Sequence, residues 1–143
     1  MKKIILSAAL VILFSGIGFG QTIGDTVISN DQAKLKLKAY YFHITDRCHT
    51  CYSIEENLRE TVFRHFNKEL EKGIIDLYIL NCEMPENQKL VKKYNAYGST
   101  LVITPVKNGK ELEHDELSAW AFKKAGNKDI FVRELKKKIK AHL

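Results

Sequence analysis

The sequence predicts a single α/β domain with a central mixed β-sheet and helices on both faces of the sheet. Strand-like and helix-like segments alternate along residues 33–143 in the order β, α, β, α, β, β, α. A strand–helix–strand unit gives parallel neighbouring strands with a right-handed crossover. The strong turn signal Asn108-Gly109 predicts a late hairpin, which adds an antiparallel edge to that sheet.

Residues 1–20 have the features of a bacterial signal peptide. Lys2 and Lys3 are followed by the apolar run Ile4–Phe14, and Gly18–Gly20 places small residues before a cleavage site at Gln21. The apolar run is shorter than the roughly 20 residues that span a membrane. We therefore expect a periplasmic or secreted protein without stable membrane association after cleavage. The alternative is an uncleaved N-terminal anchor.

About 123 residues then remain, enough for one hydrophobic core. Without Lys2 and Lys3 the formal net charge falls from +6 to +4, and much of it lies in the lysine-rich C-terminal segment 136–140. No aromatic residues are interleaved there, as a nucleic-acid groove would require. We expect a solvated helix face, no nucleic-acid binding and, without a dimer signal, a monomer.

The first half of the domain begins with residues 21–32, a loose lead-in or an edge strand. Lys34–Lys38 alternates lysine and leucine, the period of a half-buried strand, and Ala39–Ile44 continues it as a buried one. After Cys51 the period changes, which predicts an amphipathic helix of about five turns that ends at Gly73. Its apolar residues recur every four positions: Ile54, Leu58, Val62, Phe66 and Leu70.

The second half continues with a short strand at Ile74–Leu80. Pro85–Asn87 opens a second helix, and Leu101–Ile103 is strand-like. Glu111–His114 is the expected return strand of the hairpin. Asp129 is the expected N-cap of a final helix, whose inward-facing residues would be Ile130, Leu135, Ile139 and Leu143.

Cys48 and Cys51 form a C-x-x-C pair between the first strand and the first helix. A helix N-terminus carries a partial positive charge, which stabilises a thiolate and makes the first cysteine nucleophilic. The second cysteine lies one helical turn on, close enough to form a disulfide with it. This arrangement favours a reversible dithiol, and the alternative is a structural disulfide in an exported protein.

The element order, this C-x-x-C position and the late hairpin resemble the thioredoxin fold over residues 33–143. More narrowly, the motif Tyr41–Cys51 resembles a small bacterial thioredoxin-like family labelled nitrophenyl compound nitroreductase subunit ArsF, which is associated with arsenic resistance. Further marks of that family are Pro85–Asn87, Leu90–Tyr94 and Ser99–Val102. The chain has no flavin-binding signature, so we expect an accessory thiol protein.

The resemblance implies that Cys48 attacks a substrate disulfide and that Cys51 resolves the mixed disulfide. It implies a Cys48–Cys51 disulfide, exchange with protein partners and no bound cofactor. His49 is expected to stabilise the Cys48 thiolate, as a third site residue. Arg47 would lower the pKa of Cys48, bind an acidic partner, or remain a solvated surface residue.

Three features depart from the thioredoxin pattern. The residues between the two cysteines are His49 and Thr50, with no proline. Phe42 stands where many thioredoxins carry a buried aspartate, and Ser99, before Thr100, stands where the family has a cis-proline facing the thiols. Losing that proline removes a barrier to metal ligation.

A second hypothesis is therefore an accessory protein that binds As(III) or Cu(I) through Cys48, Cys51 and Cys82. Cys82 would otherwise be a buried free cysteine. His43 could add an imidazole ligand, although it lies on a strand expected to be buried. A third hypothesis is an interaction module in which the disulfide only staples the start of the helix.

Overall fold

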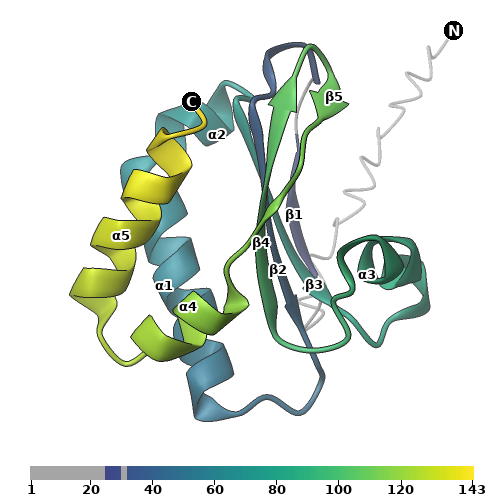
Figure 1. The fold of residues 1–143 in the computed structure, drawn as a ribbon, viewed down its shortest axis with the longest axis vertical. Coiled ribbons are helices and arrows are strands. Elements are labelled where there is room, and N and C mark those ends of the chain that lie inside the picture. The colour runs from purple at the N-terminus through teal and green to yellow at the C-terminus, as the bar shows by residue number, and fades with distance from the viewer. Residues whose placement is uncertain (1–24, 30–31) are drawn as a thin grey trace, which may run out of the picture.

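The computed structural model describes residues 25–29 and 32–143 (Figure 1). The predicted signal peptide and its cleavage site lie outside these residues. Within them, no helix is both long enough and apolar enough to cross a membrane.

A mixed β-sheet forms the centre of the molecule. Its strands lie in the order β1-β3-β2-β4-β5, and β6 also pairs with β4. Strand β2 is parallel to β3 and antiparallel to β4, whereas β1 is antiparallel to β3. The strand bounds are Thr26–Ile28 (β1), Leu37–His43 (β2), Ile75–Asn81 (β3), Thr100–Lys107 (β4), Lys110–Glu111 (β5) and Asp115–Glu116 (β6).

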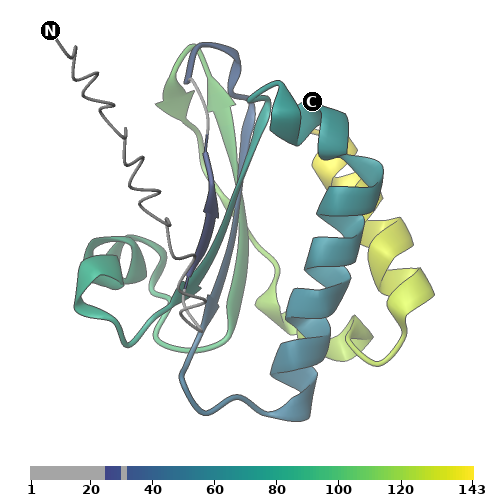
Figure 2. The same ribbon diagram turned by 180° about the vertical axis from the view of Figure 1, so that it is seen from behind.

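Helices cover both faces of this sheet. Helices α1, α4 and α5 lie against one face, and α3 lies on the other, as the two opposite views show (Figures 1 and 2). The predicted fold class is thereby confirmed as a three-layer α/β fold of the thioredoxin-like type. The helices are α1 (His49–His65), α2 (Asn67–Glu71), α3 (Gln88–Tyr94), α4 (Ser118–Lys124) and α5 (Lys128–Lys140), with 3-10 turns η1 (Gln32–Lys34) and η2 (Pro85–Asn87).

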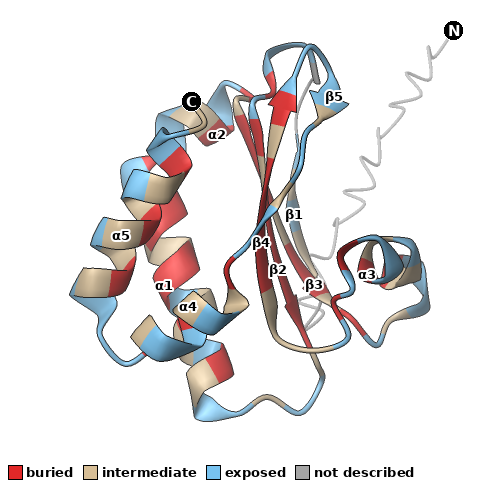
Figure 3. Cartoon of the chain, in the orientation of Figure 1, coloured by how far each residue is buried: buried red, intermediate tan, exposed pale blue. Residues whose placement is uncertain are grey.

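Strand β2 separates two hydrophobic clusters because its side chains alternate between the faces of the sheet. Leu37, Ala39 and Tyr41 join the larger cluster under α1, α4 and α5. Tyr40 and Phe42 join a smaller cluster under α3. Both faces of β2 are therefore buried, as the continuous apolar run from Ala39 predicts, and Figure 3 shows the central strands largely buried.

The long helix expected after Cys51 is interrupted. Its five predicted apolar residues are all buried, but the chain leaves helical geometry at Phe66, which has φ −132° and ψ 22°. Helix α1 ends there, and the short helix α2 follows. Gly73 comes after α2 with φ 68°, so the predicted end point is correct and the predicted continuity is wrong.

The C-terminal part differs more from expectation. The hairpin at Asn108-Gly109 is confirmed, with φ of 53° and 73° at these residues. The return strand expected at Glu111–His114 is instead two short strands, β5 and β6, and α4 follows where the sequence predicts no element. The predicted N-terminal edge strand forms as β1.

The cap of the last helix is also different. Asn127, rather than Asp129, caps α5, because its side chain accepts a hydrogen bond from the Ile130 N–H. Leu135 and Ile139 are buried as predicted. Phe131 is fully buried, whereas Ile130 is only half-buried.

Candidate functional site

The two cysteines lie where β2 gives way to α1. Cys48 is the N-cap residue of α1, with extended backbone geometry and no side-chain cap hydrogen bond. Its carbonyl accepts hydrogen bonds from the N–H groups of Cys51 and Tyr52, at 3.0 and 3.3 Å. The backbone N–H groups of Cys48, Thr50 and Cys51 at this helix end also act on the Cys48 thiol.

Cys48 and Cys51 differ in access although their sulfurs are close together. Both are free thiols with the Sγ atoms 2.8 Å apart. Cys48 is exposed, whereas Cys51 is only 7% exposed. A partner molecule can therefore reach the Cys48 sulfur. The buried Cys51 sulfur is close enough to Cys48 to form a disulfide with it after a small movement.

The pKa of the Cys48 thiol is lowered from its ordinary value. The largest cause is the hydrogen bond with the Cys51 thiol, and the backbone N–H groups of Cys51 and Thr50 add to it. These donors favour the thiolate, which is the nucleophilic form.

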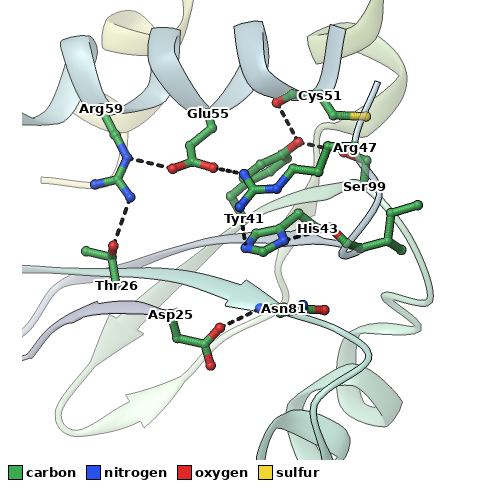
Figure 4. A network of polar contacts seen from close by, with 11 residues as sticks. Asp25, Thr26, Tyr41, His43, Arg47, Cys51, Glu55, Arg59, Asn81 and Ser99 are labelled. Atoms are coloured by element: carbon green, nitrogen blue, oxygen red, sulfur yellow. Dashed lines mark hydrogen bonds and ion pairs between the residues drawn. The ribbon is translucent and has the colours of Figure 1, made fainter. Parts of the chain in front are cut away.

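The Arg47 side chain is only 12% exposed and takes part in a chain of polar contacts (Figure 4). Its guanidinium donates to Glu55 and to Nε2 of His43, the latter at 3.0 Å. Glu55 also accepts from Arg59 at 2.8 Å, and Arg59 reaches Thr26 on β1. Burial raises the pKa of Glu55, but the hydrogen bonds from Arg59 and Arg47 outweigh it and leave that pKa below its usual value. The charge of Arg47 is thus engaged by Glu55.

His43 is buried and supports Arg47. Arginine can only donate, so Nε2 of His43 accepts and Nδ1 carries the proton, which goes to the Ile44 carbonyl at 3.0 Å. Burial lowers the pKa of His43, and the Arg47 charge lowers it further. His43 is therefore held by the Ile44 carbonyl and supports the Arg47 guanidinium, which precedes Cys48.

His49 is the first residue of α1 and is exposed. Within residues 25–29 and 32–143, no hydrogen bond or ion pair is recorded for its imidazole. Its predicted role as a thiolate-stabilising group remains a prediction.

Ser99 is linked to Cys51 through Tyr41, and its expected role in place of the cis-proline remains a prediction. The Tyr41 hydroxyl donates to the Cys51 carbonyl at 2.8 Å and lies 2.6 Å from the Ser99 hydroxyl. No cis peptide bond occurs in the described part of the chain. The Thr100 hydroxyl instead donates to the Gly98 carbonyl at 3.1 Å.

Tyr41 is the functional-site residue that the sequence reasoning missed. The signal was available, because Tyr41 alternates with Leu37 and Ala39 and so shares the face of β2 under α1. Burial raises the pKa of its hydroxyl, which keeps it neutral. It ties the first turn of α1 to the segment that precedes β4.

Cys82 and Phe42 lie in the smaller cluster under α3. Burial raises the pKa of the Cys82 thiol, and its N–H donates to the His43 carbonyl. No three His, Cys, Asp or Glu residues in the described part of the chain are grouped so that they could hold a metal ion. The three-cysteine site considered above is therefore not assembled there.

Comparison with known proteins gives no further guidance. No protein-family model, curated protein or solved structure matches this chain. The fold and the geometry of the two cysteines therefore remain the basis for proposing a function.

Proposed function

We propose that this chain is an exported thioredoxin-like thiol–disulfide oxidoreductase that acts on protein partners through Cys48 and Cys51. The observation that carries the proposal is the asymmetric pair: an exposed sulfur of lowered pKa at a helix N-terminus, 2.8 Å from a buried second sulfur. A structural disulfide needs neither the exposure nor the lowered pKa of the first thiol.

The proposed reaction has two steps. The Cys48 thiolate attacks one sulfur of a partner disulfide, the partner's S–S bond breaks, and its other sulfur leaves with the electron pair and takes a proton from solvent. Cys51 then loses its proton and attacks Cys48, which releases the second partner thiol. The partner gains two electrons and two protons, and the Cys48–Cys51 disulfide forms. The reverse sequence would oxidise the partner, and the relative stability of the two forms decides the direction.

The surroundings of the cysteines support exchange with a large partner. Tyr52, next to Cys51, is 54% exposed, and the Arg47 guanidinium lies over its ring at 5.1 Å. Export, if residues 1–20 direct it, would place the chain where disulfides form and persist. No bound cofactor is needed for this chemistry.

The first test is the redox equilibrium of the purified protein in glutathione buffers, with alkylated Cys48 and Cys51 counted by mass spectrometry. We expect a reversible transition at or above about −270 mV, the range of thioredoxins and more oxidising exchangers. A disulfide still intact below about −300 mV would indicate a structural staple. A pair that stays reduced throughout would instead favour the binding of a soft metal or metalloid ion.

The second test is the trapping of mixed disulfides. Cys51→Ser should accumulate adducts with partner proteins, because the resolving step is lost, whereas Cys48→Ser should give none. Cys82→Ser is the matched control, since Cys82 is buried in the other cluster, and it should behave like the parent protein. Absence of adducts with Cys51→Ser would argue strongly against exchange with proteins.

A further inference from the structure

A groove of about 950 Å³ opens at the end of the sheet opposite the cysteines. Strand β2 runs from this groove to the C-x-x-C loop, and its seven residues separate the two sites by about 20 Å. The groove lies among the lead-in to β2, the β4–β5 hairpin and the end of α5, which meet at the upper end of the molecule in Figure 1. It is thus distinct from the proposed redox site.

Much of the groove is lined by apolar side chains, and one of them, Leu112, is exposed. Leu35 and Val106 are buried in its wall, and Ile74 and Pro105 are half-buried beside them. Leu112 also lines the groove but is 51% exposed, although its N–H is held by the Pro105 carbonyl at 2.8 Å. An apolar ligand in the groove would cover this side chain.

The charged side chains among the described lining residues are all those of lysines. Lys34, Lys36, Lys107 and His142 line the groove, and none of its described lining residues is acidic. Lys34 and Lys107 are exposed and take part in no ion pair recorded in the described part of the chain. Lys36 donates to the Leu143 main-chain oxygen at 2.6 Å, and His142 lies 3.0 Å from Asp115.

This pattern contrasts with a neighbouring surface of the same sheet. Lys38 and Lys93 both pair with Glu111, so each of these lysines has a carboxylate partner within the protein. Of the lysines that line the groove, Lys34 and Lys107 have no carboxylate partner in the described part of the chain. An anionic group placed between Lys34 and Lys107 would supply the missing charge.

We propose that the groove binds an anionic amphiphile, a molecule with an apolar body and one negatively charged head group, such as a medium-chain fatty acid. The volume is within the range of small-molecule sites, which combine apolar walls with a few placed polar groups. The apolar body would lie over Leu112 and Val106, and the head group would face Lys34 and Lys107. The site does not depend on the proposed redox activity.

The experiment is a fluorescence titration of the purified protein with dansyl-aminoundecanoate, followed by displacement with laurate. We expect saturable binding that laurate reverses and that the uncharged dodecanol reverses much less. The double variant Lys34→Glu/Lys107→Glu should lose about tenfold or more in affinity. Leu112→Asp should weaken binding as well, and Cys48→Ser should leave it unchanged.

The matched control is Lys123→Glu/Lys137→Glu, which makes the same charge change at exposed lysines of α4 and α5. Its affinity should equal that of the parent protein, and thermal melting should show that all variants remain folded. An equal loss in this control, displacement by dodecanol as effective as by laurate, or no saturable binding would overturn the proposal. Displacement by hexaglutamate but not by laurate would also overturn it and identify an acidic peptide as the occupant.

Discussion

At the scale of single residues, Cys48 and Cys51 differ in exposure, and this difference determines which thiol a partner molecule can reach. The location of Cys48 and Cys51 at the start of α1 could be predicted from the sequence, because it depends only on the order of neighbouring strand and helix segments. The contact of Tyr41 with Ser99 could not, because it joins residues 58 positions apart. Arg47 shows the same limit: its neighbour in sequence is Cys48, but its ion-pair partner is Glu55, on the second turn of α1.

The lowered pKa of Cys48 gives a prediction for its reactivity. We expect half-maximal alkylation of reduced Cys48 at a pH below about 8.5, the value for a free cysteine. Because the Cys51 thiol is the largest cause of the shift, Cys51→Ala should move that midpoint to higher pH. The measurement is the rate of iodoacetamide modification against pH, followed by peptide mass spectrometry. An unchanged midpoint in Cys51→Ala would contradict this cause.

Glu55 gives a prediction for stability. Glu55→Gln should lower the free energy of unfolding at pH 7 by about 1–3 kcal/mol, because it leaves Arg47 and Arg59 without their shared carboxylate. The folded-state pKa of Glu55 is lowered, so its contribution is present above the unfolded value of about 4.3 and is lost as pH falls through the folded value.

Urea denaturation at pH 7 and pH 3 checks this sign. The difference between the free energies of unfolding of the parent and Glu55→Gln should be smaller at pH 3 than at pH 7. Glu60→Gln is the control, since Glu60 and Arg64 form a more exposed pair, and it should change stability less. A difference for Glu55→Gln that persists undiminished at pH 3 would show that the charge is not responsible.

At the scale of elements, the long periodic segments were predictable and the short ones were not. The four-residue repeat of apolar side chains predicted the helical segment that forms α1 and α2. It did not predict the break at Phe66, because the apolar side chains of both helices face the same core and the repeat continues across the break. Helix α4 is only seven residues long, and its N-cap residue is Leu117, whose side chain makes no cap hydrogen bond. Its sequence therefore carries neither a long periodicity nor an N-cap signal. Strand β6 has two exposed acidic residues and forms only because β4 offers it an edge.

The cap of α5 can be tested directly. Asn127→Ala should destabilise the protein by about 1 kcal/mol, because the Ile130 N–H loses its acceptor. Asp129→Asn, at the position the sequence favoured as the cap, should cost less, since only its interaction with the helix dipole is lost. Chemical denaturation of both variants measures the difference. A larger loss for Asp129→Asn would reverse the assignment.

At the scale of the whole molecule, the fold class could be predicted because alternating elements and one hairpin signal restrict the topology. The division of the core into a larger and a smaller hydrophobic cluster could not be predicted, because it depends on which helices cover each face of the sheet. Helices α1, α4 and α5 share the larger cluster, whereas α3 alone covers the smaller one. More apolar side chains are therefore buried between the sheet and the helices on the α1 face than on the α3 face.

The difference in size between the two clusters predicts which helix unfolds locally at the lower free energy. Amides of Gln88–Tyr94 in α3 should exchange through a partial unfolding of lower free energy than the amides of α1, because α3 is short and packs on the smaller cluster. Native-state hydrogen exchange at increasing urea, resolved by peptide, measures both. Equal opening free energies for α3 and α1 would mean that the two layers unfold together.

The exposure pattern of the cysteines has a practical consequence. Cys48 is exposed, whereas Cys51 and Cys82 are buried, so a bulky maleimide dye has one point of attachment on the native, reduced chain. No cysteine need be removed to obtain a singly labelled protein. Because that point is the sulfur that would be consumed on oxidation, the labelled fraction of a sample is also a direct count of the molecules that still carry a free thiol there.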